Sequence, residues 1–305
     1  MDANADLALQ DELYPELDDR IGVGVIVITI AFFFVVNAVI LRLSQRVVTL
    51  KMTSQWRWRN LAVSWVHADI CALGIWYCYA HYRHHIQVLT DMIDLRPYPA
   101  YILLAFSTGY FLYDFLDHIL QGQSMKQWEV TLHHIAVLFI FGYNLLFHTS
   151  VAFSVLALIV EINSVFLHFR KLLQMVQLPF SHWLYRTTVA LNLVTFVFFR
   201  GAAMVLIWAG LLYSRHKFSV VYFVALGLVM VFMIVLNPVL FWRLLRSDVL
   251  RGRRKTRVQQ KEADGHVVQN GDPTGTATAA ARISENVSRG LGCQSDGTCC
   301  KSKTS

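Results

Sequence analysis

The amino-acid sequence predicts an all-α protein, a polytopic transmembrane helix bundle of about seven spans. The chain of 305 residues is 55% hydrophobic and only 15% charged, whereas soluble domains carry about 25% charged residues. Apolar runs of helix length recur along it, and a run of roughly 20 residues crosses the hydrocarbon core of a bilayer. Basic residues gather beside some of these runs and not beside others, as they do in multi-pass membrane proteins. We therefore expect helices packed within a membrane.

Seven apolar runs are long enough to be spans. They cover residues 21–41, 61–80, 99–120, 128–147, 150–169, 187–213 and 218–242. The fourth and fifth leave almost no loop between them, so we expect a tight antiparallel hairpin. The alternative is a protein of six spans, if the first or the sixth run is misread.

Charge sets the expected orientation and the division of the chain. Basic residues cluster at 42–59, 170–186 and 243–257, whereas residues 1–20 hold seven acidic residues against Arg20. The positive-inside rule then places the N-terminus outside and the C-terminus in the cytosol. We expect an acidic, solvated extracellular arm at 1–20, the first span with a basic cytosolic loop at 21–54, and a transmembrane domain at 55–248. Residues 249–305 are basic and then rich in Gly, Ser and Thr, which predicts a disordered cytosolic tail.

Polar side chains inside the apolar runs point to a site. Some recur at steps of three and four and so share one helical face. On the third run these are Ser107, Tyr110, Asp114, Asp117 and Gln121, and on the second Asn60, Ser64, His67 and Cys71. The fourth run carries the pair His133 and His134, the fifth Glu161, Asn163 and Ser164, and the sixth Arg200. Ionisable groups within a membrane face protein or water, because exposure to lipid is costly.

The expected depths of these groups place them in one layer of the cytosolic half of the bilayer. We predict a polar pocket lined by Asp114, Asp117, His133, His134 and Glu161, with Arg200 deeper and able to pair with Glu161. As a catalytic site, its residues would be His133, His134, Asp114 and Asp117, with a histidine as general base or acyl-accepting nucleophile. As a lipid-binding site, it would also use His67, Glu161, Ser164 and Arg200. The alternative is that these groups only join helices through interhelical hydrogen bonds.

Other ligand classes receive no support from the sequence. The net charge of +7 lies beside apolar runs, which favours anionic headgroups over nucleic acid. The five cysteines lack the spacing of a zinc site, and we predict no metal and no cofactor. The expected partners are membrane phospholipids or acyl chains, together with membrane proteins.

Several motifs carry a resemblance to a known family. The His133-His134 pair, the Asp114-x-x-Asp117 pair on the preceding run and the Glu161-containing partner resemble the TLC-domain family, which includes the ceramide synthases. The similarity covers about residues 55–248. Further motifs are similar to a plasma-membrane subgroup that regulates fluidity by limiting polyunsaturated acyl chains in phospholipids. They are residues 56–60 (WRWRN), 109–111 (GYF), 128–129 (WE) and 244–248 (LLRSD).

The resemblance implies a function and also contains a departure. Ceramide synthases carry two aspartates three residues apart on the span after the histidines, where this chain has Glu161 and Ser164. Acyl transfer to a sphingoid base is therefore placed in doubt. The expected function is regulation of membrane phospholipid composition and fluidity. The alternatives are a ceramide-synthase-type acyltransferase and a non-enzymatic cargo receptor or channel regulator, and whether the protein is an enzyme stays open. The expected compartment is the plasma membrane. The alternative is the endoplasmic reticulum, because Lys301 and Lys303 have the spacing of a dilysine retrieval signal.

Overall fold

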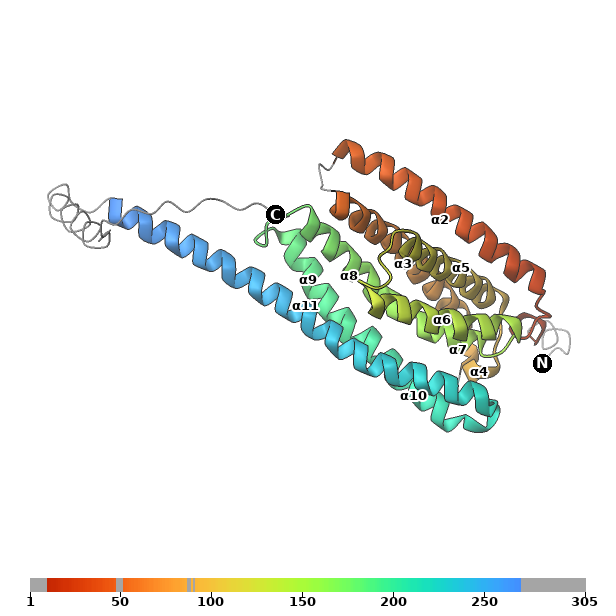
Figure 1. Ribbon diagram of the computed structural model, residues 1–305. Helices are drawn as coiled ribbons and strands as arrows, with labels where there is room; N and C mark the ends of the chain where they lie inside the picture. The colour runs from red at the N-terminus through yellow and green to blue at the C-terminus, as the bar shows by residue number, and fades with distance from the viewer. Residues whose placement is uncertain (1–9, 48–51, 87–88, 90, 270–305) are drawn as a thin grey trace, which may run out of the picture. The chain divides into compact units, whose positions relative to one another are not determined.

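The computed structural model describes residues 10–47, 52–86, 89 and 91–269, and within these ranges the chain forms helices and no strands (Figure 1). The all-α prediction is confirmed. The elements are α2 (Asp19–Val47), α3 (Met52–Tyr82), η1 (Arg83–His85), α4 (Asp91–Asp94), α5 (Tyr98–Leu120), α6 (Trp128–Leu146), α7 (Val151–Leu158), α8 (Val160–Met175), α9 (Trp183–Thr195), η2 (Phe196–Gly201), α10 (Ala202–Tyr213), η3 (Arg215–Lys217) and α11 (Val220–Gln269). The chain divides into two compact units, 1–247 and 248–305, and the first contains the bundle.

Six helical segments of the described chain are long and apolar enough to cross a membrane. They are Asp19–Ser44, Gln55–His85, Trp128–Leu146, Val151–Met175, Trp183–Tyr213 and Val220–Asp248. The protein is thus a multi-pass membrane protein. The first and sixth predicted runs, either of which would be absent in the alternative of six spans, are both among these segments.

The third predicted run, α5, is not among these six segments. Its 23 residues would extend about 34 Å at 1.5 Å per residue, so its length suffices. Two carboxylates and four tyrosines lower its hydropathy. This more polar helix lies inside the bundle, packed against α2, α3, α6 and α7. Leu104, Ala105 and Ser107 on it have no exposed surface.

Bulky apolar side chains cover the outer surface of the bundle. On α2, the exposed fractions of Val27, Ile28 and Val35 are 60%, 70% and 62%, which suits contact with lipid chains rather than water. The opposite face of α2 packs on α5 through Phe33, whose ring centroid lies 4.9 Å from that of Tyr110. Gly109 lets the two backbones approach, because a Cβ there would lie 2.8 Å from the carbonyl oxygen of Ile26.

The predicted hairpin between the fourth and fifth runs is confirmed. Only residues 147–150 separate α6 from α7. The turn is tight enough to need left-handed backbone at His148 (φ 48°) and Ser150 (φ 52°). Asn144 Nδ2 donates to Ser154 Oγ across the turn at 2.7 Å and joins the two helices.

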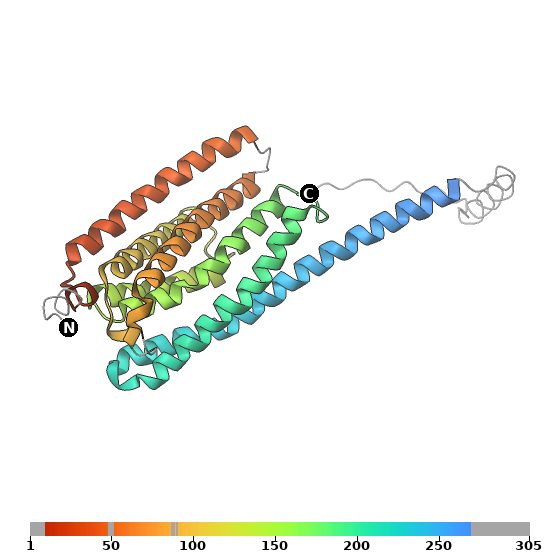
Figure 2. The same ribbon diagram turned by 180° about the vertical axis from the view of Figure 1, so that it is seen from behind.

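Two predicted spans are not continuous α-helices. The fifth is divided at Ile159 into α7 and α8, and Glu161 follows the break by two residues. The sixth contains the π-helical turn η2, which carries Arg200. Figure 2 shows α9, η2 and α10 as one nearly continuous rod. π-Helical turns often occur at functional sites, and both interruptions bring an ionisable residue into the interior.

The predicted ends of the chain are described only in part. Leu13 is buried with Tyr82, Leu95 and Ala152, whereas acidic residues of the arm such as Asp11 and Glu16 are exposed. The boundary that we drew at residue 249 falls within α11, because the helix continues through the basic stretch to Gln269. The rest of the predicted tail, with Lys301 and Lys303, lies outside the described residues, as do residues 1–9.

Candidate functional site

The polar stripes of α3 and α5 face each other. Asn60 Nδ2 donates to Asp114 Oδ1 at 2.6 Å, and Cys71 Sγ lies 3.2 Å from Ser107 Oγ. Between them the His67 ring stacks on Tyr110, with ring centroids 3.7 Å apart. The two faces predicted from the spacing of polar residues are therefore one interface, and Asp114 lies at its edge nearest α6.

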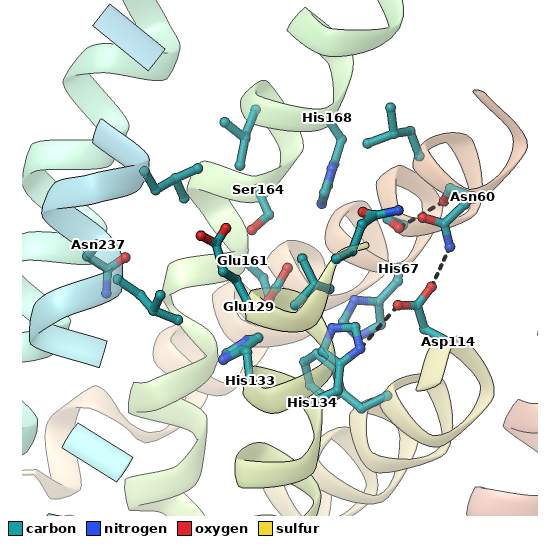
Figure 3. Close-up of a pocket in the computed structure, with 18 of the residues that line it drawn as sticks. Asn60, His67, Asp114, Glu129, His133, His134, Glu161, Ser164, His168 and Asn237 are labelled. Atoms are coloured by element: carbon teal, nitrogen blue, oxygen red, sulfur yellow. Dashed lines mark hydrogen bonds and ion pairs between the residues drawn. The ribbon is translucent and has the colours of Figure 1, made fainter. Parts of the chain in front are cut away.

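Asp114 is the centre of a buried polar cluster (Figure 3). Its Oδ2 lies 3.2 Å from His134 Nδ1 and 3.3 Å from His118 Nδ1. His118 Nδ1 is also 2.9 Å from the backbone oxygen of Asp114, one turn earlier. Only 2% of Asp114 and 6% of His134 are exposed. The carboxylate thus fixes the orientation of His134 from α6 and of the Asn60 amide from α3.

The two adjacent histidines have different surroundings. His134 Nδ1 lies within ion-pair distance of Asp114 Oδ2, at 3.2 Å, although the two do not have hydrogen-bond geometry. The buried Nδ1 of His133 has neither a hydrogen-bond partner nor a carboxylate within ion-pair distance among the described residues. The His133 ring lies edge-on to Phe111, with centroids 6.3 Å apart. A buried polar atom without a partner is uncommon and calls for a reason. His133 is therefore the histidine that is free to contact a ligand, and His134 is the one that is anchored.

Asp117 does not join this cluster, contrary to our prediction. It accepts hydrogen bonds from Trp56 Nε1 at 2.9 Å and from Arg59 Nη2 at 3.1 Å. Three residues along an α-helix turn about 300°, which leaves Asp117 about 60° away from Asp114. It consequently faces the beginning of α3 and ties that helix to the end of α5.

Arg200 is held by neutral acceptors. Its Nε donates to Asn163 Oδ1 at 2.8 Å, its Nη1 to Asn237 Oδ1 at 3.1 Å and its Nη2 to Ser164 Oγ at 3.2 Å. The ion pair with Glu161 that the sequence allows is not formed by direct contact among the described residues. Because Ser164 offers a hydroxyl where an acid would offer a carboxylate, the guanidinium is positioned without being neutralised by contact.

A cavity of about 280 Å³ lies among α3, α5, α6, α8, η2 and α11, and each of these elements contributes at least one polar side chain to its lining. The predicted site residues on its wall are His67, Asp114, His133, His134, Glu161, Ser164 and Arg200. Of the residues in our two predicted sets, Asp117 alone is not on it. Figure 3 shows His133, Glu161 and Ser164 gathered from α6 and α8, with Asn237 opposite on α11.

A second, apolar cavity of about 130 Å³ continues the first. The two have six wall residues in common: Phe111, His133, Glu161, Arg200, Met233 and Asn237. Beyond them the wall is formed by side chains such as Val137, Ala157 and Leu226. We call the first the polar cavity and the second the apolar arm. Together they join a polar compartment to an apolar one, with His133, Glu161 and Arg200 at the junction.

Sequence reasoning did not assign a site role to several wall residues. His168 lies on the polar cavity together with Glu161 and Ser164, and the spacing 161, 164, 168 is that of one helical face. That signal was present in the sequence. Asn237, Glu129 and Arg243 also contribute, and their role depends on how α11 packs, which spacing does not reveal. No group of three or more His, Cys, Asp or Glu in the described ranges is arranged to hold a metal.

Comparison with known proteins agrees with the motifs. The profile of the TLC domain matches residues 57–246. TLC domain-containing protein 2 of Danio rerio is 34% identical over 209 residues, which cover 68% of this chain and 82% of that protein. TLC domain-containing protein 1 of Gallus gallus is 34% identical over 211 residues, covering 69% and 81%. The human TLC domain-containing protein 1 is 30% identical over 194 residues, covering 63% and 76%. With this similarity over most of the transmembrane region, the chain belongs to the TLC-domain family.

Proposed function

We propose that this protein regulates the phospholipid composition and fluidity of its membrane by binding acyl lipids in the joined cavities. It would thereby limit the incorporation of polyunsaturated chains into phospholipids. The observation that supports this most strongly is the continuity of the polar cavity with the apolar arm through residues common to both walls. An acyl lipid has the same division, a polar end and an apolar chain.

The polar end offers contacts for an ester, phosphate or carboxyl group. Arg200 supplies a fixed guanidinium without a carboxylate in contact, and His133 supplies a ring nitrogen without a hydrogen-bond partner. Burying a polar ligand group is favourable only if such partners compensate its lost hydration. The apolar arm would accept the chain by excluding water from it.

A second candidate is acyl transfer, and His133 is the observation that favours it. An imidazole with a free ring nitrogen beside an acyl site can act as a base or a nucleophile. Against this, Ser164 Oγ is occupied with Arg200, and the chain lacks the second acid that ceramide synthases carry at this place. Binding without transfer is therefore the primary proposal.

The test is phospholipid acyl-chain profiling in cells that lack the protein or express it, under a challenge with saturated fatty acid. Wild type should lower the polyunsaturated share, and His133→Ala should abolish this effect. Leu132→Ala is a matched control, because this neighbour on α6 is 43% exposed and does not border either cavity. An unchanged profile with wild-type protein would refute the proposal.

The plasma membrane is the compartment that we propose, from the resemblance stated above. The alternative, retrieval to the endoplasmic reticulum, depends on Lys301 and Lys303. Replacing both by serine should leave a plasma-membrane protein where it is. Movement of the protein to the cell surface after this change would instead establish retrieval. Microscopy of a tag placed before the first span reads the outcome.

A further inference from the structure

The wall of the polar cavity includes exposed residues at the beginning of α6 and on α11, such as Val130 and Arg243, and we call this part the mouth. Gln127, Glu129 and Val130 border it on one side, and Leu240 and Arg243 on the other. This end lies away from the apolar arm, whose wall includes none of these five residues. A lipid chain in the arm would therefore have its polar end directed toward the mouth.

An ion pair with two parallel hydrogen bonds crosses this mouth. Arg243 Nη1 donates to Glu129 Oε2 at 2.6 Å, and Nη2 donates to Oε1 at 2.8 Å. The side chains are 60% and 29% exposed, so the pair is in contact with solvent and can open. A guanidinium presents the same fork to a phosphate as to a carboxylate. The Glu129 carboxylate thus occupies the position in which a ligand phosphate would meet Arg243.

A second feature attracts anions to the same point. Glu129 lies in the first turn of α6, and the N-cap residue Gln127 makes no side-chain capping hydrogen bond. The N-terminus of a helix carries partial positive charge and favours anions. Arg243 and the α6 N-terminus come from segments more than 100 residues apart, and both border the mouth of one cavity.

A purely structural role for the pair would be weak. Exposed ion pairs add little to stability, because solvent screens them and ordering long side chains costs entropy. By contrast, an ion pair at the entrance of a cavity selects among ligands by their charge, because a charged ligand can take the place of one partner. An internal carboxylate that occupies the anion site would yield it to a ligand phosphate, whereas a neutral ligand would leave the ion pair in place.

We infer that Arg243 is the phosphate-contacting residue for the cavity's ligand, and that Glu129 is an internal anion which this phosphate displaces. The inference rests on the proposed function, since it names the class of lipid that enters. The ligand is then an acyl compound that carries a phosphate near its polar end. Two sources share this chemistry, a phospholipid and a coenzyme A thioester.

Binding to the purified full-length protein in detergent tests the inference with three probes. Oleoyl lysophosphatidylcholine and oleoyl coenzyme A carry phosphate, and monoolein has the same chain without phosphate. Arg243→Gln should weaken binding of a phosphate-bearing probe about tenfold, the effect of losing a hydrogen bond to a charged group. Glu129→Gln should strengthen it about two- to fivefold, because the competing ion pair is gone. Neither change should alter the affinity for monoolein.

Arg246→Gln is the matched control. It removes the same charge from the same helix, but Arg246 is exposed and does not border the cavity, so its affinities should equal those of wild type. The phosphate probe that responds to Arg243 identifies the source. The inference would be overturned, with the proposed function still standing, if Arg243→Gln lost as much affinity for monoolein as for the phosphate probes. Weaker binding of the phosphate probes by Glu129→Gln would have the same consequence. If wild type binds none of the three probes, the proposed function fails with it.

Discussion

The contrast between the adjacent histidines gives the sharpest prediction. His134→Ala removes the contact of 3.2 Å with Asp114 Oδ2 and leaves a carboxylate that is only 2% exposed with fewer partners. The two groups lie within ion-pair distance without hydrogen-bond geometry, and taking a polar partner away from a buried group costs about 1–3 kcal/mol. His133→Ala removes no hydrogen bond at Nδ1, and loses at most the edge contact with Phe111, worth about 0.5–1.5 kcal/mol.

Thermal unfolding in detergent, followed by tryptophan fluorescence, measures the difference. At roughly 2–4 °C for each kcal/mol in a protein of this size, His134→Ala should lower Tm by about 2–12 °C. His133→Ala should lower it by about 1–6 °C, less than His134→Ala does, and yet abolish the effect on lipid composition. His134→Gln, which keeps an N–H donor, should recover part of the lost stability. Equal losses of Tm for the two alanine variants, or a larger loss for His133→Ala, would refute the assignment of anchor and ligand contact.

Three further predictions concern packing, the second carboxylate and the apolar arm. Gly109→Ala forces a Cβ to within 2.8 Å of backbone on α2 and should destabilise the bundle by about 1–3 kcal/mol. Gly142→Ala is its control, because a Cβ there has no atom within 4 Å, and it should not destabilise the bundle. Equal melting temperatures of the two variants would count against the α2–α5 packing. Arg59→Gln removes the ion pair of 3.1 Å to Asp117 and should lower Tm without changing lipid binding. A loss of lipid binding without a loss of Tm would instead show that Asp117 belongs to the binding site. Ala157→Phe should fill part of the apolar arm and weaken binding of long acyl chains more than short ones, and an equal effect on both would show that the chain lies elsewhere.

Composition and periodicity were sufficient to predict the helical bundle and one face of the site. The residues at 107, 110 and 114 recur with helical spacing, and in the structure this face meets the corresponding stripe of α3. The short connection at 147–150 likewise predicted the hairpin, because so few residues can join two long helices only if the helices are antiparallel neighbours. These features are local, or follow from the cost of burying polar groups in an apolar medium, so the sequence contains them.

Other parts of the site depend on packing that the sequence does not encode locally. Asp114 and Asp117 look equivalent by spacing, but they lie about 60° apart around the helix axis and therefore contact different neighbours. Nothing in the residues around Ile159 or Phe196 distinguishes a broken helix from a continuous one, and tertiary contacts decide the outcome. Arg243 looked like one of many basic residues beside a span. Its role emerges only because α11 brings it to the beginning of α6.

The π-helical turn of η2 is the place at which its span accommodates one extra residue. A π turn contains one residue more than the α turn that it replaces. Deleting a single residue from Phe196–Gly201 would let this turn become α-helical and would leave the parts before and after it at nearly the same relative rotation. A deletion within α9 or α10 would instead rotate the two parts of the span by about 100° relative to each other. Either Asn192, which accepts from Asn163 Nδ2 at 3.0 Å, or the wall residue Ile207 would then leave its place. Relatives of this protein should therefore tolerate the loss of a residue at this turn far better than a loss elsewhere in the span.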